Sequence, residues 1–195
     1  MWYMVFSQCK IYEKTGIATL LSKVKQITFQ RRRSMKLTLL SSSFNDGDYL
    51  STKHCLSSEF GFGCDGNNIS PELHWSSIPD STKSLAITCY DPDAPTGSGF
   101  WHWLIVNIPP TVNSIEEGVS KLPHGALETR TDFGKPGYGG PCPPEGSHPH
   151  RYIFTIFCLS VDFIPVESNT SAAVVGFMIN ANKINESTLM GLFKR

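Results

Sequence analysis

The sequence predicts a β-dominated domain, most simply a sandwich of sheets, with one or two short helices at its periphery. Short apolar runs of strand length recur along the 195-residue chain, and clusters of turn residues separate them. Glycine (16 residues) and proline (13 residues) are frequent, as many turns require. Only one stretch, near the C-terminus, has a helical pattern, so we expect a β protein rather than a helix bundle.

Near-continuous apolar character distinguishes two of the predicted strands, SLAITCY and HWLIVNI. Runs of this kind are typical of strands that are buried on both faces. The first predicted strand is followed by a turn at Asn45–Asp48, because its Asp-Gly pair adopts positive φ at low cost. The predicted strands are Lys36–Ser42, Glu72–Trp75, Ser84–Tyr90, His102–Ile108 and Arg151–Val161.

Loops and one helix complete the predicted order. Gly61–Asn68 reads as loop, and Phe133–Pro149 is too rich in Gly and Pro for regular helix or strand. A loop as long as the second, inside a compact domain, is usually functional or disordered, and its Tyr, Phe and Cys favour a packed, functional loop. Ala172–Asn182 has apolar residues at helical spacing. We expect Asn185–Ser187 to break this helix and Leu189–Phe193 to form a final strand.

The formal net charge of zero hides an asymmetry along the chain. Residues 1–34 hold seven Lys and Arg and one Glu, whereas residues 35–195 hold ten cations and sixteen anions. We therefore divide the chain into a basic N-terminal extension, 1–34, and one domain, 35–195. The extension is either a targeting or membrane-surface arm or a disordered appendage upstream of the true start at Met35. We favour the second interpretation, because a new strand pattern begins at Met35.

Composition excludes several classes of protein. The balanced charge argues against a whole-chain nucleic-acid binder, and no segment approaches the ~18 apolar residues of a transmembrane helix. Residues 1–34 lack the apolar core and cleavage site of a secretory signal, so we expect a cytoplasmic protein. The six cysteines are sparse and form no CxxC pair, which predicts mostly reduced thiols. Cys89 and Cys158 lie in apolar runs, where we expect buried side chains.

Polar side chains gather at the ends of three predicted strands. The segment Asp91–Pro95 (DPDAP) ends one buried strand, His102 enters the next, and His148–Arg151 (HPHR) begins the long aromatic one. Taken singly, these residues are ordinary turn formers, a core histidine and a surface ion pair. Taken together they predict a small pocket, in which imidazoles donate hydrogen bonds to an anion and a carboxylate orients them.

Enzymatic interpretations are weaker. Two carboxylates and two imidazoles could ligate a metal ion, but their spacing matches no HExxH-type signature. Cys142 and His150 could act as nucleophile and base, although the prolines on either side of Cys142 favour a rigid loop wall. The chain has no GxSxG, P-loop or GxGxxG motif. We predict neither a metal ion nor a cofactor, and no enzymatic activity.

The motifs, in their order, resemble the phosphatidylethanolamine-binding protein family, in its bacterial-type branch of Raf kinase inhibitor-like proteins. The resemblance covers about residues 35–195 and implies an antiparallel β-sandwich with short helices near the C-terminus. Phe100 and Trp101, ahead of His102, depart from the residues common in animal members. The matching segments are Ser70–Leu73 (SPEL), Asp91–Pro95, His102, Asp132–Gly134 (DFG), Tyr138–Pro144 (YGGPCPP) and His150–Tyr152 (HRY).

The resemblance also implies a rigid pocket for phosphate-like or other anionic groups, including phospholipid head groups. It assigns to Asp91 the orientation of His102 or His150, and to Arg151 an ion pair with a carboxylate such as Asp93. The ligand-binding residues that it implies are Asp91, Asp93, Pro95, His102, Pro143, Pro144, His150 and Tyr152.

We therefore predict non-enzymatic binding of an anionic small molecule or phosphate group, with modulation of a phosphorylated partner or a kinase as its consequence. The alternative is a hydrolase or protease-inhibitor-like protein that uses the same Asp/His pocket. A third interpretation is a protein-interaction module with a vestigial pocket. The sequence leaves the oligomeric state open, and a homodimer is one of the states that we consider.

Overall fold

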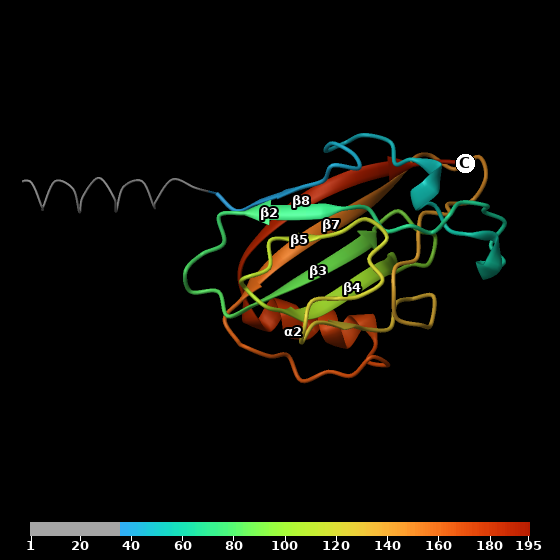
Figure 1. Cartoon of the computed structure of the whole chain (residues 1–195). Helices are drawn as coiled ribbons and strands as arrows, with labels where there is room; N and C mark the ends of the chain where they lie inside the picture. Colours follow the sequence, from blue (N-terminus) through green and yellow to red (C-terminus); the bar gives the residue numbers. More distant parts are fainter. Residues whose placement is uncertain (1–35) are drawn as a thin grey trace, which may run out of the picture. The chain divides into compact units, whose positions relative to one another are not determined.

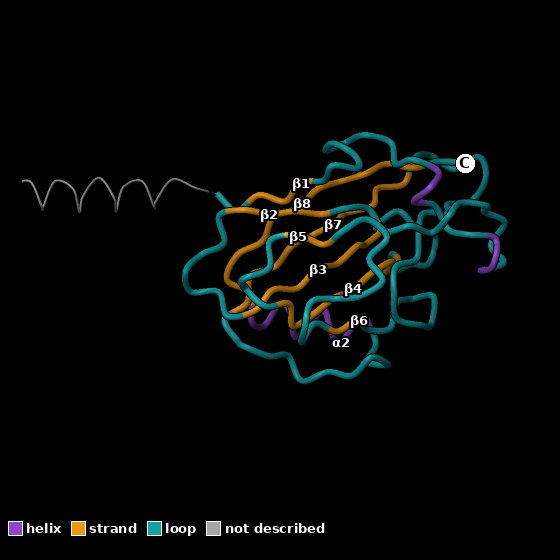
Figure 2. The backbone as a smooth tube through the Cα atoms, in the orientation of Figure 1, coloured by secondary structure: helices purple, strands orange, loops and turns teal. Residues whose placement is uncertain are grey.

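Two antiparallel sheets form the domain in the computed structural model, which describes residues 36–195 (Figures 1 and 2). The basic extension, the start at Met35 and Cys9 lie outside the described residues. The smaller sheet has the order β1 (Thr38–Leu40), β2 (Leu73–Ser76), β5 (Ser114–Ile115). The larger sheet has the order β6 (Leu127–Glu128), β4 (Phe100–Ile108), β3 (Ser84–Asp91), β7 (His150–Leu159), β8 (Lys183–Phe193). Two 3₁₀ turns, η1 (Thr52–His54) and η2 (Ser58–Phe60), and helix α2 (Ala172–Asn182) complete the elements.

The fold confirms the predicted antiparallel sandwich, and its central strands are buried on both faces as expected. Along β3, Leu85, Ile87 and Cys89 face a core shared with the small sheet, where they pack with residues such as Trp75 and Trp103. The intervening Ala86 faces a second core against α2, because successive strand side chains point to opposite faces. Figure 1 shows α2 beside the β3 and β4 end of the large sheet.

Helix α2 spans the predicted residues, but the chain after it differs from the prediction. The break in the helix was expected at Asn185–Ser187 and the last strand at Leu189–Phe193. Instead α2 ends at Asn182, and β8 begins at Lys183 and runs through Asn185–Ser187. Asn185 pairs with Cys158 and Ser187 with Ile156 across the neighbouring strand β7. Pairing with β7 supplies backbone hydrogen bonds that override the low strand propensity of Asn and Glu. None of the helices within residues 36–195 is long and apolar enough to cross a membrane.

Asn107, near the end of β4, joins the large sheet to the chain that precedes α2. It has a left-handed backbone (φ 59°), and its side chain is buried. Its amide nitrogen donates to the Ile164 carbonyl (3.1 Å), and its amide oxygen accepts from the Ile164 N–H (2.7 Å). Asparagine is one of the few residues that tolerate this conformation. The position therefore requires a residue that accepts a left-handed backbone and whose side chain both donates and accepts a hydrogen bond.

Replacing Asn107 by Ala should destabilise the domain by about 2–3 kcal/mol, because it leaves the buried Ile164 N–H without a partner and removes one of the two hydrogen bonds to the Ile164 carbonyl, which also accepts from the Val166 N–H. Urea denaturation followed by fluorescence measures this loss. Asn113→Ala, at an exposed position, is the matched control and should stay within about 0.5 kcal/mol of the wild type. Equal stability of the two variants would contradict the structural role of Asn107.

Candidate functional site

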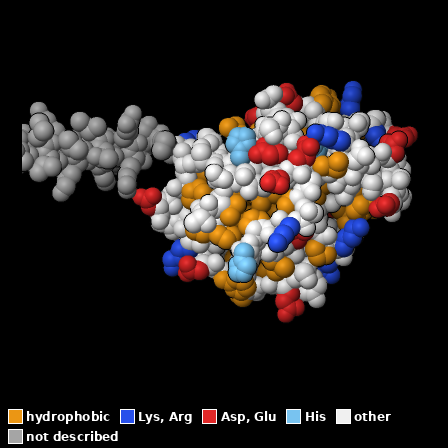
Figure 3. Space-filling view, in the orientation of Figure 1, with side chains coloured by type: hydrophobic (Ala, Val, Ile, Leu, Met, Phe, Trp, Pro, Cys, Tyr) orange, Lys and Arg blue, Asp and Glu red, His pale blue; other side chains and the backbone are white. Residues whose placement is uncertain are grey.

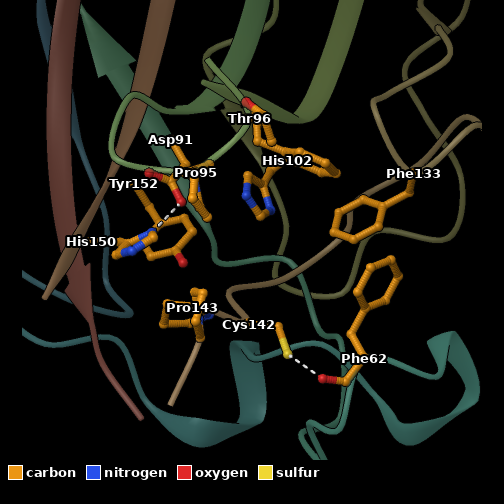
Figure 4. Close-up of a pocket in the computed structure, with 13 residues that line it drawn as sticks. Phe62, Asp91, Pro95, Thr96, His102, Phe133, Cys142, Pro143, His150 and Tyr152 are labelled. Carbon is orange, nitrogen blue, oxygen red and sulfur yellow. Dashed lines mark hydrogen bonds and ion pairs between the residues drawn. The ribbon is translucent and has the colours of Figure 1, made fainter. Parts of the chain in front are cut away.

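A cavity of about 200 Å³ lies where three strands of the large sheet meet (Figure 4). Strand β3 ends at Asp91, opposite Phe100 at the beginning of β4. On its other side, Tyr90 pairs with Ile153, close to the beginning of β7 at His150. Antiparallel pairing therefore places the end of β3 beside the starts of both neighbours. The three polar elements singled out in the sequence meet for this reason.

Of the eight residues predicted to bind a ligand, seven line the cavity, and Asp93 does not. Sequence reasoning missed Phe62, Ala94, Thr96, Phe100 and Phe133 as lining residues, although Phe100 was noted as a difference at the rim. Cys142 lines the cavity as part of the expected loop wall. The seven are Asp91, Pro95, His102, Pro143, Pro144, His150 and Tyr152.

Asp91 orients His150. Oδ2 of Asp91 accepts a hydrogen bond from Nδ1 of His150 at 2.8 Å, and both side chains are about 3% exposed. The other carboxylate oxygen accepts from the Asp93 backbone N–H (2.8 Å), which fixes the carboxylate in the turn. Because the carboxylate only accepts, the Nδ1 atom carries the proton. The Nε2 atom of His150 remains for a ligand in the cavity.

His102 is held by the backbone instead of by a carboxylate. Its Nδ1 atom donates to the Gly139 carbonyl at 2.6 Å, and its side chain is buried. Burial lowers the pKa of His102 below its ordinary value, although the Gly139 carbonyl and the Asp91 charge act in the opposite direction. The neutral ring then presents an unprotonated Nε2, which accepts a hydrogen bond. This geometry disagrees with the prediction that both imidazoles donate to an anion.

Asp93 serves the turn and not the cavity. Its carboxylate accepts from Nε (2.9 Å), Nη2 (2.8 Å) and the backbone N–H (2.9 Å) of Arg151. The hydrogen bonds from the Arg151 side chain lower the pKa of Asp93 to about 2. The expected ion pair of Arg151 is therefore present. It ties the Asp91–Pro95 turn to the first residues of β7, where His150 lies.

The opposite side of the cavity is aromatic. Phe133 contacts Phe100 (ring centroids 4.8 Å apart), Phe62 (5.8 Å) and the His102 ring (5.4 Å), all edge to face. Figure 4 shows Phe62 and Phe133 across the cavity from His150 and Tyr152. Burial raises the pKa of the Tyr152 hydroxyl well above its ordinary value, so this group is a neutral hydrogen-bond donor. The cavity is thus polar at the Asp91 end and apolar at the Phe62 end.

A disulfide joins Cys64 to Cys142 and overturns part of the cysteine prediction. The expectation of mostly reduced thiols is wrong for this pair, whose partners lie 78 residues apart, because the fold brings two loops together. The proposed Cys142 nucleophile is likewise excluded in this structure, since its sulfur is bonded. Cys55, Cys89 and Cys158 are free and buried, as predicted for the latter two.

Metal binding finds no support in the geometry of the carboxylates. Asp91 is paired with His150, and Asp93 is paired with Arg151. Within residues 36–195, no group of three His, Cys, Asp or Glu residues is arranged to hold a metal ion.

Comparison with known proteins gives the family. The sequence pattern described as "Phosphatidylethanolamine-binding protein" matches residues 40–194. The chain belongs to the phosphatidylethanolamine-binding protein family. The UPF0098 protein YbcL of Escherichia coli is 47% identical over 173 residues, which cover 86% of this chain and 92% of the relative. A UPF0098 protein of Methanothermobacter thermautotrophicus is 38% identical, with coverage of 82% and 99%.

Solved structures agree with this family. The crystal structure of E. coli YbcL, described as a new member of the mammalian PEBP family, matches with a TM-score of 0.79 at 47% identity. The match covers 83% of this chain and 99% of that chain. The PEBP homologue CT736 of Chlamydia trachomatis has a TM-score of 0.71 at 28% identity, with the same coverage. Together with the relatives, these matches confirm the family that the motifs indicated.

Arg151→Gln should cost about 1 kcal/mol or less at pH 7, because the arginine side chain is half exposed. The folded pKa of Asp93 is about 2, below its ordinary 3.8, so the pair stabilises the fold fully above pH 3.8. This stability is lost as the pH falls through 3.8 toward 2. Urea denaturation at several pH values should therefore show the variant and the wild type converging in acid. Lys121→Gln, at an exposed position, is the control, and a pH-independent difference would speak against the pair.

Proposed function

We propose that this protein binds a small phosphate-bearing ligand in the cavity at the ends of β3, β4 and β7, without catalysing a reaction. The observation that carries the proposal is the buried Asp91–His150 pair, which holds one imidazole in a fixed orientation beside the Tyr152 hydroxyl. Family membership supports a ligand-binding function. The ligand-binding roles of Asp91, Pro95, His102, Pro143, Pro144, His150 and Tyr152 are part of this proposal.

Attraction of an anion has to come from the cavity and not from the charge of the domain. Residues 36–195 carry ten Lys and Arg against sixteen Asp and Glu. Figure 3 shows side chains of both signs scattered over one face, around a central band of hydrophobic ones. A net negative domain repels anions at long range. Short, directed hydrogen bonds inside a partly enclosed cavity are effective nevertheless, because they are little screened by solvent.

The cavity favours a phosphate group that still carries one proton. His102 offers an acceptor at Nε2, whereas Tyr152 offers a donor, so the preferred ligand both donates and accepts. A phosphate monoester has a second pKa of about 6 and meets this demand as its monoanion. A phospholipid head group or a phosphorylated residue of a partner protein, such as a kinase, presents related chemistry. Modulation of such a partner is the cellular role that we propose.

A cytoplasmic location and a homodimer remain predictions. The disulfide weighs against a strongly reducing compartment, where cysteine pairs are usually kept reduced unless they have a transient or sensing role.

The hydrolase alternative has one observation in its favour, since a carboxylate-oriented imidazole is a general-base arrangement. However, the side chains that line the cavity offer this imidazole no free nucleophile to activate. Cys142 is bonded to Cys64, and the Thr96 hydroxyl donates to the Gly99 carbonyl. Burial keeps the Tyr152 hydroxyl protonated. Turnover of an activated ester that disappears in His150→Gln would favour the enzyme over the binder.

His150→Gln should weaken binding of phosphoethanolamine about tenfold or more, the equivalent of one lost charge-assisted hydrogen bond. The Gln amide can still donate to Asp91, which limits damage to the fold. Calorimetric titration measures the affinity. His74→Gln, in β2 and outside the cavity, is the matched control. If the wild type and both variants bind equally, the assigned site is wrong.

Affinity for phosphoethanolamine should rise as the pH falls from 8 to 6, because the monoanion becomes populated near its second pKa of about 6. Sulfate, which carries no proton in this range, should bind more weakly and without that rise. Titrations of both ligands at pH 6, 7 and 8 make the comparison. Tighter binding of sulfate than of phosphoethanolamine at pH 6 would show that His102 does not act as the acceptor.

A further inference from the structure

Two irregular segments face each other on the apolar side of the cavity. Residues 61–64 follow η2 and bring Phe62 to the cavity, and residues 142–144 bring Cys142, Pro143 and Pro144. Phe62 lines the cavity although 58% of its surface is exposed. Its ring contact with Phe133 is one of few contacts that hold it, so its position depends largely on its backbone. How the first segment is held therefore decides whether this wall of the cavity is formed.

The first link between the two segments is covalent. Cys64 and Cys142 form the disulfide, and the segments otherwise lie far apart in the sequence. Cys64 is nearly buried, whereas Cys142 lines the cavity. A small reductant can therefore reach the Cys142 sulfur through the cavity.

The second link is the side chain of Arg195. Its Nη1 atom donates to the Gly63 carbonyl at 2.6 Å, and its Nε atom donates to the Pro143 carbonyl at 3.0 Å. Each acceptor is the immediate chain neighbour of one of the two bonded cysteines. The guanidinium thus spans the same two segments as the disulfide, with charge-assisted hydrogen bonds instead of a covalent bond.

The backbone contributes little to this junction. Gly61 donates to Ser58 within its own turn, which ties it to η2 and not to the opposite loop. The nearest backbone hydrogen bond between the two loops, from the Leu56 N–H to the Pro141 carbonyl, lies before residues 61–64 in the chain, and Gly66 donates to Leu56 within the first loop. Residues 61–64 consequently form a short loop whose attachment to the opposite wall depends on one disulfide and one arginine.

We propose that the Cys64–Cys142 disulfide and Arg195 form a redox-sensitive latch that holds the Phe62 wall of the cavity in place. With the disulfide formed, the wall is fixed and the cavity is ready for its ligand. With the disulfide reduced, only Arg195 joins the two segments, and Phe62 leaves the cavity for part of the time. Arg195 is a positioning residue, since it acts on the cavity through the Gly63 and Pro143 carbonyls. The effect on the ligand rests on the proposed function, whereas the latch itself does not.

The redox step balances with a dithiol as the reductant. One thiolate of the dithiol attacks the Cys142 sulfur, the Cys64–Cys142 bond breaks, and Cys64 leaves as a thiolate that takes up a proton. The second thiol of the reductant then displaces Cys142 from the mixed disulfide. Two electrons and two protons pass to the protein, and the dithiol becomes a cyclic disulfide. Oxidation runs the same exchange in reverse with a disulfide-containing oxidant.

Linkage adds a reciprocal consequence. If the oxidised form binds the ligand more tightly, a bound ligand favours the disulfide by the same factor. A ligand in the cavity also covers the Cys142 sulfur that the reductant has to attack. Phosphoethanolamine should therefore slow the reduction of the protein.

The latch is tested on the full chain in oxidised and dithiothreitol-reduced form. The variant Cys64→Ser, which cannot form the disulfide, is a second test of the same state. Hydrogen exchange of a peptide covering residues 57–64 should rise on reduction and in Cys64→Ser. Affinity for phosphoethanolamine should fall about tenfold, as expected for the loss of one aromatic wall. Circular dichroism checks that each form stays folded.

The variant Arg195→Gln distinguishes a latch made of two links from a general loss of stability on reduction. We expect a small effect while the disulfide is intact and a larger one after reduction, because the two links span the same segments. The disulfide of Arg195→Gln should also be reduced faster, as followed by thiol labelling and mass spectrometry. Lys194→Gln, at the neighbouring exposed position, is the matched control and should behave as the wild type.

The outcomes separate the two proposals. Unchanged exchange in residues 57–64 after reduction, together with wild-type rates in Arg195→Gln, would overturn the latch. If exchange rises but no form of the protein binds phosphoethanolamine, the proposed function fails and the latch stands. If all forms bind equally while exchange rises, the latch does not control the ligand, and the inference about affinity is wrong.

Discussion

The register of β3 between β4 and β7 is the constraint on which the site depends. The strand is central in the large sheet, and its pairing places Asp91 beside the starts of both neighbours. A slip by one residue would exchange the two faces of the strand, because side chains alternate. Leu85, Ile87 and Cys89 would then meet the α2 side, and Asp91 would lose His150. The same hydrophobic alternation that builds the two cores therefore also aligns the buried carboxylate with its imidazole.

The chemistry of the cavity follows from what each polar group already binds. Asp91 is used by His150, His102 donates to a carbonyl, and Asp93 is neutralised by Arg151 outside the cavity. The groups that remain for a ligand are the Nε2 atoms of His102 and His150 and the hydroxyl of Tyr152. These groups distinguish between hydrogen-bond patterns, and they provide little net charge. Such a cavity suits selective recognition of a partly protonated anion better than strong attraction of any anion.

The two sides of the cavity are held by different means. The polar side is built on strand ends, where ladder hydrogen bonds and buried cores fix the backbone. The aromatic side is built on irregular segments that a disulfide and an arginine connect. The proposed latch therefore acts on the wall around Phe62 and not on the groups that would contact a phosphate. Under this proposal, the part of the site that gives the cavity its shape is also the part that is regulated.

Local signals in the sequence were enough for the strands β2, β3, β4 and β7, for helix α2, and for the family. Apolar runs, turn residues and ordered motifs act over a few residues, and so they can be read without the fold. The path of β8 through Asn185–Ser187, the disulfide, and the aromatic wall had no such signal. No local signal indicated the hydrogen bond from His102 to the Gly139 carbonyl either. These features join residues that are distant in the chain, and strand register and loop closure bring them together. Long-range pairing is a property of the whole fold, which is why tertiary structure was needed to find it.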